Sequence, residues 1–537
     1  MADTTPLLPP YPTTSSSSSS ASSSSASSSS HQIPKPSTHS IDEAIESHIG
    51  ATTAAAQLLP ASLAALAWVF DAQQTFINVF ADAMPPWHCT SPSCSEAAAA
   101  AGSSPCNLPP SSWSWSLPPY TSTISSWSLQ CSSPALLALP SSSFFLGCLT
   151  GGFLLATLAD SRLGRKNMLL LSSLLMSLSA ALTAASPSLL VYAALRFICG
   201  FGRATVGTSA LVLSTELVSR RWRDRVSIIG FLCFTIGFLS LPGIAYVARG
   251  ESWRTLYVLT AAPAFVYTVV VYFTMKESPR WLLLKGRRLE AIETIKKMTG
   301  GGNKVINSSF SNLAFVVPHV GADEETSDNI FAAAKTLWYN RWAFRRLTAL
   351  MTVSFGVGVV YYGMPLNLGN LSSNLYLSVA LNAITELPSS LLVFCLISHM
   401  NRRSSTLAFT AASGLFSLAC AAKGGRGGWL EMAAEAELAA FFSACTGFSF
   451  VLIYSIELFP TCVRNSAIAM VRQALVLGGV FAPVIVAEGR RRRVLSFGVF
   501  GLAIGCCGVF AACLPETRGK VLSDTMEEEE CAGACGN

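Results

Sequence analysis

The sequence predicts an all-α membrane protein with about twelve spanning helices in two sets of six. Hydrophobic residues make up 51% of the 537 residues and charged residues only 12%, whereas soluble globular chains carry roughly a quarter charged residues. Mean hydropathy is +0.46. The chain also contains about twelve apolar runs near the roughly 20 residues that a spanning helix needs. A long polar stretch, residues 276–346, divides these runs into six and six.

Six predicted spans make an N-terminal half, residues 56–275. They follow a serine-rich tail, residues 1–55, which has too few apolar side chains to form a core and is expected to be disordered and cytoplasmic. The second span contains no charged residue at all. The runs are Pro60–Phe80, Ala135–Ala159, Asn167–Ala185, Leu189–Leu213, Ser227–Ala248 and Leu256–Met275.

Six further spans make a C-terminal half, residues 347–514. They follow the central loop, residues 276–346, and precede a tail, residues 515–537, and both of these are expected in the cytoplasm. The runs are Leu347–Asn367, Tyr376–His399, Thr406–Ala422, Leu438–Ile456, Ala467–Val486 and Leu495–Leu514.

Lysine and arginine indicate the orientation, because cytoplasmic loops of membrane proteins carry an excess of these residues. None occurs between Lys35 and Arg162, which assigns the loop 82–134 to the outer or lumenal side. Basic residues instead follow the second, fourth, sixth, eighth and twelfth spans. A four-arginine cluster, Arg490–Arg493, is an exception on the predicted outer side.

The outer loop carries four cysteines that we expect to form disulfides in an oxidising compartment. Four cysteines allow three pairings, and the sequence does not choose between them. Asn370-Leu371-Ser372 is a glycosylation sequon that also faces outward. The four cysteines are Cys89, Cys94, Cys106 and Cys131.

Charged strings follow predicted spans on the inner side. Ala159–Lys166 joins the second and third spans through a tight turn, which Gly164 permits. Glu277–Leu283 follows the sixth span, and Pro515–Gly519 follows the twelfth. We expect their charges to pair at the cytoplasmic mouth as a conformational latch, although they could serve only as topological anchors. The latch candidates are Asp160, Arg165, Glu277, Arg280, Glu457, Arg464, Glu516 and Arg518.

These strings resemble signatures of the major facilitator superfamily, and the resemblance covers the chain from the first span to Gly519. It implies the major facilitator fold, in which two six-helix bundles face a site at the membrane midplane. The string Ala159–Lys166 departs from the pattern by one extra residue between Asp160 and Gly164, and Ala156 replaces a glycine.

Four features resemble the organic cation/carnitine transporters of that superfamily, and the serine-rich tail resembles the plant members. The resemblance implies a secondary transporter of organic cations, carnitine included, that works by alternating access. The four features are the cysteine-bearing loop, Glu277–Leu283, Tyr361-Tyr362-Gly363 and Glu457–Asn465.

Charged residues inside spans are functional candidates because burying them in a membrane is costly. Glu386 lies in the eighth span before Pro388, where it could hold a quaternary or protonated amine. Tyr361 and Tyr362 could add cation–π attraction of about 0.5–2 kcal/mol. Alternatives for Glu386 are a hydrogen bond between helices or a part in proton coupling, and for the tyrosines ordinary packing.

Arg472 in the eleventh span could hold a carboxylate through two parallel hydrogen bonds. With Glu386 it would suit the two ends of carnitine, which carries a trimethylammonium and a carboxylate. In the animal family the charge-selecting position falls on Val476, which is apolar, and Arg472 lies one turn earlier. Arg472 could equally pair with a carboxylate inside the protein. Asp71 in the first span is the candidate for a coupling proton.

The sequence indicates no enzyme, because it contains no metal-ligand spacing, no nucleophile constellation and no cofactor motif. Membrane topology explains the net charge of +6, so no nucleic-acid partner is needed. The expected partners are the lipid bilayer and a small organic cation or zwitterion, and the oligomeric state is undecided. Alternative functions are a sugar or other small-solute porter of the same fold and a non-transporting membrane sensor.

A short signal near the N-terminus bears on location. Asp3, Leu7 and Leu8 match the acidic dileucine pattern Asp-x-x-x-Leu-Leu, which in plant transporters resembles a vacuolar-membrane address. We therefore expect a multi-pass protein of the vacuolar membrane, with the plasma membrane as the alternative.

Overall fold

The computed structural model describes residues 46, 53–91, 94, 105–158, 163–298, 330–370, 374–423, 430–490, 493–519 and 523–534. Within these ranges, twelve helical stretches are long and apolar enough to cross a membrane. The predicted all-α membrane class is therefore confirmed. Asp160, Asp3, Leu7 and Leu8 lie outside the described residues.

The first six spans come from nine helices, because the first and fourth spans are interrupted. Leu66 and Ile77 divide the first span into three helices, and Ala204 and Thr205 divide the fourth into two. The helices are α2 (Ala54–Ala65), α3 (Ala67–Phe76), α4 (Asn78–Ala81), α7 (Pro134–Leu158), α8 (Arg165–Thr183), α9 (Leu189–Arg203), α10 (Val206–Glu216), α11 (Arg220–Val247) and α12 (Trp253–Thr274).

The last six spans are continuous helices, apart from two 3₁₀ helices, Leu368–Asn370 and Val509–Cys513, that end the seventh and the twelfth. The tenth begins at Leu430, well before the predicted Leu438, and so includes Glu437. The helices are α17 (Arg341–Asn367), α18 (Leu375–Leu396), α19 (Arg402–Lys423), α20 (Leu430–Glu457), α21 (Thr461–Gly489) and α22 (Arg493–Gly508).

Two helix pairs make most of the contact between the halves: α7 packs against α21, and α11 packs against α18. Ser142 of α7 donates a hydrogen bond to the carbonyl oxygen of Val480 in α21 (2.9 Å). Gly152 of α7 lies directly against Gln473, since a Cβ at Gly152 would fall 1.8 Å from the Gln473 amide nitrogen. Residues at these positions therefore lie on the surface between the two halves.

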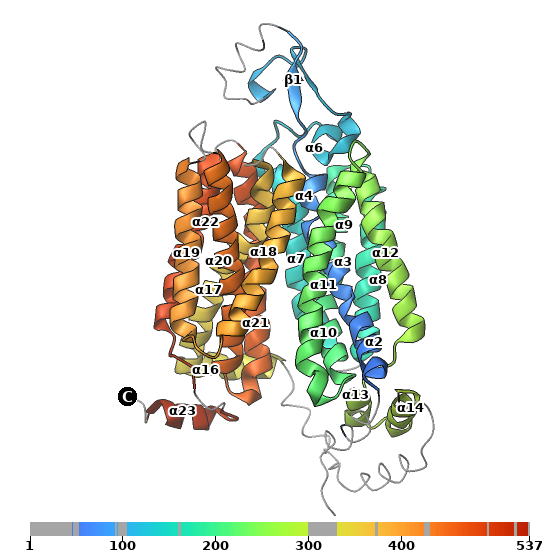
Figure 1. The fold of residues 1–537 in the computed structure, drawn as a ribbon, viewed down its shortest axis with the longest axis vertical. Coiled ribbons are helices and arrows are strands. Elements are labelled where there is room, and N and C mark those ends of the chain that lie inside the picture. The colour runs from blue at the N-terminus through green and yellow to red at the C-terminus, as the bar shows by residue number, and fades with distance from the viewer. Residues whose placement is uncertain are drawn as a thin grey trace, which may run out of the picture. The chain divides into compact units, whose positions relative to one another are not determined.

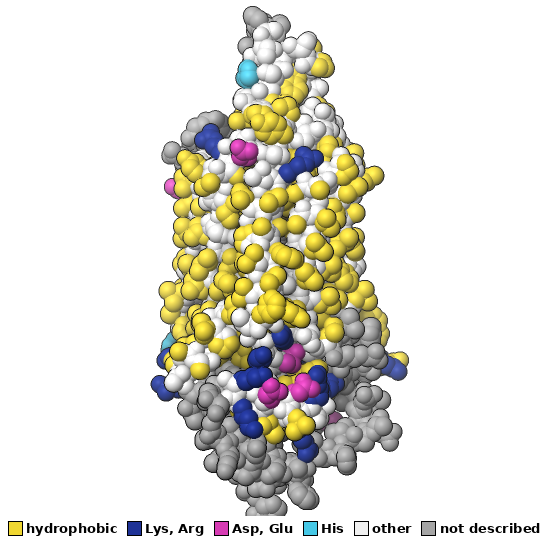
Figure 2. All heavy atoms as spheres, turned by 90° about the vertical axis from the view of Figure 1, so that its right-hand side faces the viewer, with side chains coloured by type: hydrophobic (Ala, Val, Ile, Leu, Met, Phe, Trp, Pro, Cys, Tyr) yellow, Lys and Arg dark blue, Asp and Glu magenta, His cyan; other side chains and the backbone are white. Residues whose placement is uncertain are grey.

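The surface has a broad apolar middle. Hydrophobic side chains cover the central part of the face in Figure 2, and lysines and arginines gather at the end away from the β-strands. Large apolar side chains such as Phe394 and Leu415 are more than half exposed, as expected where the solvent is lipid. We call the basic end inner and the opposite end outer.

Among the described residues, four short helices lie at the inner end (Figure 1). Three of them, α13 (Pro279–Leu284), α14 (Arg288–Met298) and α16 (Ile330–Tyr339), lie in the predicted central loop, and α23 (Met526–Ala534) lies in the C-terminal tail.

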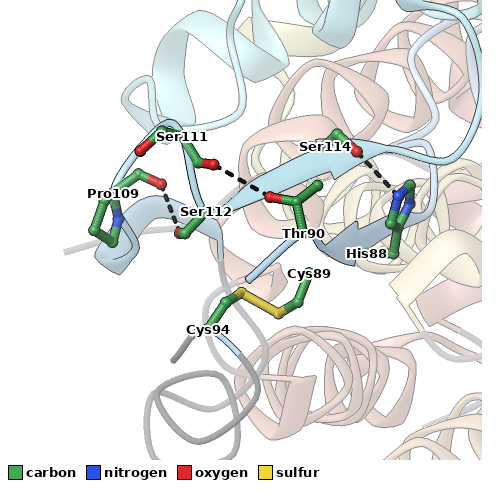
Figure 3. Close-up of a disulfide and its surroundings, with 8 residues drawn as sticks. All are labelled: His88, Cys89, Thr90, Cys94, Pro109, Ser111, Ser112 and Ser114. Atoms are coloured by element: carbon green, nitrogen blue, oxygen red, sulfur yellow. Dashed lines mark hydrogen bonds between the residues drawn. A yellow bond between two sulfur atoms is a disulfide. The ribbon is translucent and has the colours of Figure 1, made fainter. Parts of the chain in front are cut away.

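The outer loop forms a small disulfide-linked unit. Strand β1 (Trp87–Cys89) pairs antiparallel with β2 (Trp113–Trp115), and Trp87 lies opposite Trp115. Disulfides join Cys89 to Cys94 and Cys106 to Cys131, which is one of the three possible pairings. Figure 3 shows the first of them beside the hydrogen bonds from Thr90 to the Ser111 carbonyl (3.2 Å) and between Ser114 and His88 (3.1 Å). These side chains hold the two strands together around the disulfide.

Candidate functional site

Glu386 lies where the two halves meet. Its carboxylate accepts hydrogen bonds from the Tyr361 hydroxyl of α17 (2.6 Å) and from the Thr235 hydroxyl of α11 (3.4 Å). Tyr361 belongs to the same half as Glu386, and Thr235 belongs to the other. The Glu386 side chain is only 7% exposed. No cation pairs with it among the residues that the structure describes.

The Tyr361 ring lies beside this carboxylate, and the Tyr362 ring lies against Tyr361. The Tyr361 ring stacks between Phe448 (centroids 5.0 Å apart) and Phe441 (6.0 Å). The Tyr362 ring meets Tyr361 edge-on at 5.2 Å and contacts Phe145 of the opposite half at 4.6 Å. Aromatic faces beside a carboxylate form an environment that suits an organic cation.

Asp71 and Arg203 form a bidentate ion pair inside the N-terminal half. Arg203 Nε lies 2.5 Å and Nη2 3.1 Å from the two carboxylate oxygens of Asp71. Asp71 is 2% exposed, and Arg203 is the last residue of α9, at the interruption of the fourth span. The predicted proton carrier is thus already compensated by a fixed positive charge.

Arg472 lies near this ion pair but is not part of it. Its electrostatic neighbours are Tyr362, Arg203 and Asp71. No hydrogen bond or ion pair reaches the Arg472 guanidinium from any described residue. Both interpretations of Arg472, a substrate carboxylate and an internal carboxylate as its partner, stay predictions.

Glu386 and Arg472 neighbour consecutive residues of one helix, α17. Tyr361 contacts Glu386, and the next residue, Tyr362, is the neighbour of Arg472. Consecutive helical residues point about 100° apart, so the two tyrosines reach toward different partners. This arrangement gives the interface an acidic side and a basic side.

An outer cavity of about 960 Å³ lies between the halves, above these residues. Phe80 of the first span stacks on Tyr376 of α18 (5.5 Å), and Tyr246 of α11 meets Tyr376 edge-on (5.6 Å). The cavity is lined by Asn78, Phe80, Asp82, Tyr246, Tyr376 and Arg490 among others, whereas Glu386 and Arg472 do not line it.

Asp82 and Arg490 join the halves at this outer end. Arg490 donates a hydrogen bond to the backbone carbonyl of Asp82 (2.9 Å). Burial raises the pKa of the Asp82 carboxyl, and hydrogen bonds from Asn78, Thr123 and Tyr192 counteract this rise. Burial lowers the pKa of Arg490, and Asp82 counteracts that fall. The exceptional arginine cluster thus supplies a contact between the halves, which the sequence did not indicate.

Two predicted latch carboxylates hold the ends of equivalent helices. Glu277 accepts hydrogen bonds from the backbone N–H groups of Arg165 (2.8 Å) and Lys166 (3.0 Å) at the start of α8. Gly164 has φ of 84°, and a Cβ there would lie 2.5 Å from this carboxylate. Glu516 accepts from the N–H groups of Arg402 (2.7 Å) and Arg403 (3.1 Å) at the start of α19. Each carboxylate satisfies free amides at the positive end of a helix dipole.

The other latch candidates contact partners that the sequence analysis did not name. Glu457 pairs with Arg402 (2.9 Å), a residue that is not among the predicted latch candidates. Arg464 donates to the Phe459 carbonyl (3.1 Å), and Arg518 donates to the Asn401 side chain (3.4 Å). Arg280 is half-buried in α13. The latch role of the eight candidates stays a prediction.

Replacing Arg402 with alanine should destabilise the folded protein. Arg402 bonds Glu457 and the carbonyls of Ile397 and Met400 (2.8 Å for Met400). Removing one partner of a partly buried ion pair leaves the other uncompensated, at a cost of about 2–3 kcal/mol. We expect a lower thermal unfolding midpoint in detergent than for Arg403→Ala, whose side chain is exposed. Equal midpoints for the two variants would contradict this assignment.

Asn370 lies just beyond the outer end of α17. Its amide nitrogen donates to the Asn367 side chain (2.7 Å) and to the Val486 carbonyl (3.1 Å). Glycosylation would have to break both bonds, and the modification stays a prediction.

Glu437 is a buried carboxylate that the sequence analysis missed. It is 2% exposed and accepts a hydrogen bond from the amide nitrogen of Asn382 in α18 (3.1 Å). The sequence did contain a sign of this carboxylate, because Glu437 directly precedes the predicted tenth span. The cluster of Glu431, Glu435 and Glu437 made the stretch look like a loop.

Comparisons with known proteins agree with this geometry. A family model described as "Sugar (and other) transporter" matches residues 95–528. The chain is 53% identical to organic cation/carnitine transporter 3 of Arabidopsis thaliana over 496 residues, which cover 92% of this chain and 94% of that protein. It is 29% identical to human organic cation/carnitine transporter 2 over 425 residues, which cover 78% and 73%.

The fold is similar to that of a solved transporter. The inward-open conformation of the xylose transporter XylE from E. coli matches with a TM-score of 0.59 and 18% identity, covering 88% of this chain and 98% of that one. At this identity the match concerns the fold alone.

Proposed function

The chain belongs to the organic cation/carnitine transporters within the sugar (and other) transporter family, and from this premise we propose that it carries small organic cations or zwitterions across a membrane. Carnitine is a leading substrate. Transport proceeds by alternating access, as one six-helix half moves against the other.

The observation that carries this proposal is the environment of Glu386. The Glu386 carboxylate is 7% exposed, lies where the halves meet and has no described cationic partner. Leaving such a buried negative charge without a counter-ion is energetically costly. A trimethylammonium or protonated amine supplies the missing positive charge. The rings of Tyr361 and Tyr362 offer that group an aromatic surface.

Arg472 is the proposed contact for a substrate carboxylate. Asp71, an electrostatic neighbour of Arg472, already binds Arg203 through both oxygens, and no described acid forms an ion pair with Arg472. We place the cationic end of a zwitterion toward Glu386 and its carboxylate toward Arg472. Simple cations would use only the first contact.

Asp71 remains the proposed carrier of a coupling proton in the N-terminal half. Protonation would release Arg203 from its ion pair, because a neutral carboxyl no longer attracts the guanidinium. The positive charge near Arg472 would then rise and favour a substrate carboxylate.

Uptake by the purified chain in liposomes tests the proposed function. Labelled carnitine and labelled tetraethylammonium should both enter, and labelled glucose should not. Uptake of glucose without either cation would indicate the sugar porter instead. Absence of any flux, together with saturable cation binding, would indicate a sensor.

The vacuolar membrane is the proposed location, because Asp3, Leu7 and Leu8 match an acidic dileucine signal. A fluorescent fusion should label the vacuolar membrane, and Leu7→Ala with Leu8→Ala should move it to the plasma membrane. Leu58→Ala with Leu59→Ala serves as the control pair. If the first double variant stays on the vacuole, this signal is not the address.

A further inference from the structure

We propose that Glu437 is a proton-binding site in the C-terminal half, and that its proton is exchanged for the organic cation at Glu386. This inference rests on the proposed function and goes beyond it, since it adds a second proton site and couples that proton to the cation at Glu386. Glu437 is separate from Asp71, which lies in the other half and is paired with Arg203.

The first argument is charge. Glu437 is 2% exposed and lies seven residues from the outer start of α20, or about 10 Å along the helix axis. No lysine, arginine or histidine pairs with it among the described residues. A bare carboxylate at this depth would cost several kcal/mol, so Glu437 needs a positive ion. The residues that line the outer cavity do not include it, and of all cations the proton requires the least space.

The second argument is an unfilled acceptor beside it. Asn382 is fully buried and donates its Nδ2 to Glu437 Oε1 (3.1 Å), while its own Oδ1 has no hydrogen-bond partner. A protonated carboxyl facing an amide can form both bonds of a cyclic pair. The amide N–H donates to one carboxyl oxygen, and the carboxyl O–H donates to the amide oxygen. A proton on Glu437 would therefore satisfy Asn382 Oδ1, whose burial without a partner costs about 1–3 kcal/mol.

The third argument links this proton to the proposed cation site. Asn382 and Glu386 lie four residues apart on α18, so they are neighbours on one helix face. Both Glu386 and Glu437 act electrostatically on the Cys445 thiol of α20. The two carboxylates therefore share one poorly solvated seam of the bundle, in which charges interact strongly.

Among the described groups around Glu437, none carries a fixed positive charge that would repel its proton. Helix α20 packs against α17, α18, α19 and α21. The titratable groups in this seam are Tyr361 from α17, Glu386 from α18, Cys420 from α19 and Cys445 from α20 itself. The structure gives Glu437 no charged partner from α21 among the described residues. In the part of the chain that the structure describes, the seam thus contains two carboxylates and no fixed positive charge.

The sign of the coupling follows from these charges. While Glu386 is ionised and empty, its negative charge favours the proton on Glu437. When a cation binds Glu386, that charge is neutralised and the proton on Glu437 is held less tightly. The carboxyl O–H bond then breaks, the proton passes to water, and one positive charge has replaced another. Because such coupling is reciprocal, protonation of Glu437 also favours release of the cation.

The test uses the full chain in liposomes with labelled tetraethylammonium. Exchange of internal for external cation at equal pH requires no net proton movement, whereas an acidic interior should drive accumulation. We expect Glu437→Gln to keep exchange and to lose the accumulation driven by the pH gradient. Glu435→Gln, which changes an exposed carboxylate on the same helix, should behave like the unaltered protein. Gradient-driven accumulation by Glu437→Gln at the unaltered level would overturn the proposal.

Two further measurements separate this proposal from the proposed function and from misfolding. Infrared spectra of the purified protein should contain a protonated-carboxyl band that weakens when the cation is added and is missing in Glu437→Gln. Identical spectra for Glu437→Gln and Glu435→Gln would overturn the proton site, whether or not cations are transported. In Asn382→Asp two carboxyls would share one proton and hold it more tightly, so driven uptake should persist with its midpoint moved to higher pH. An unmoved midpoint would also count against the site.

Discussion

Glu386→Gln should abolish uptake of organic cations while leaving the protein folded. The amide keeps the size of the side chain and can still accept a hydrogen bond from Tyr361, whose hydroxyl lies 2.6 Å from the carboxylate. It removes the negative charge that would bind the substrate ammonium. Losing one buried charge partner costs about 3 kcal/mol, or roughly 100-fold in affinity. Labelled tetraethylammonium uptake measured well below saturation reports this loss.

Two controls show whether the loss belongs to the charge at this position. Glu435→Gln removes an exposed carboxylate and should leave uptake unchanged. The amount of Glu386→Gln protein in the membrane and its elution profile in detergent should match those of the unaltered protein. If Glu386→Gln carries cations at the normal rate, the carboxylate holds the helices together and does not bind substrate.

Arg472→Gln should weaken transport of zwitterions and spare simple cations. A charged hydrogen-bonding contact is worth about 1.5–3 kcal/mol, which corresponds to roughly ten- to hundred-fold weaker binding of carnitine. Tetraethylammonium has no carboxylate and should be carried as before. Competition of unlabelled carnitine against labelled tetraethylammonium measures this difference in a single assay.

Arg403→Gln is the matched control for Arg472→Gln, because its side chain is exposed at the inner end of α19. It should leave both substrates unaffected. Equal losses of carnitine and tetraethylammonium transport in Arg472→Gln would remove the proposed carboxylate contact and assign Arg472 a structural role.

The spanning helices could be predicted from the sequence because lipid requires long apolar segments with all backbone groups paired internally. The error at the start of the tenth span has a physical cause. Glu431, Glu435 and Glu437 look like a polar loop to any measure of local hydropathy. In the structure Glu435 remains exposed, while Glu437 is buried against Asn382. That distinction depends on tertiary packing.

The members of the candidate site could be listed from the sequence, but their partners could not. A charge inside a span is visible in the sequence, and this identified Glu386, Arg472 and Asp71. The ion pair of Asp71 with Arg203 and the contact of Asp82 with Arg490 join residues far apart in the chain. Only the packing of the helices brings them together.

The inner end illustrates the same limit. The charge pairs expected for Glu277 and Glu516 stay a prediction, and the structure shows both carboxylates bound to backbone amides at the starts of α8 and α19. Helix N-termini offer several free N–H groups in one place. A carboxylate therefore finds partners there that no sequence motif displays.

Protection of Glu386 from chemical labelling tests the central claim most directly. A hydrophobic carbodiimide reacts with carboxyls inside the membrane, and mass spectrometry of peptides reports the labelled fraction of Glu386 and Glu437 separately. We predict that tetraethylammonium or carnitine, but not glucose, lowers labelling of Glu386 in proportion to its occupancy. Cation transport with labelling of Glu386 unchanged at saturating substrate would contradict the account.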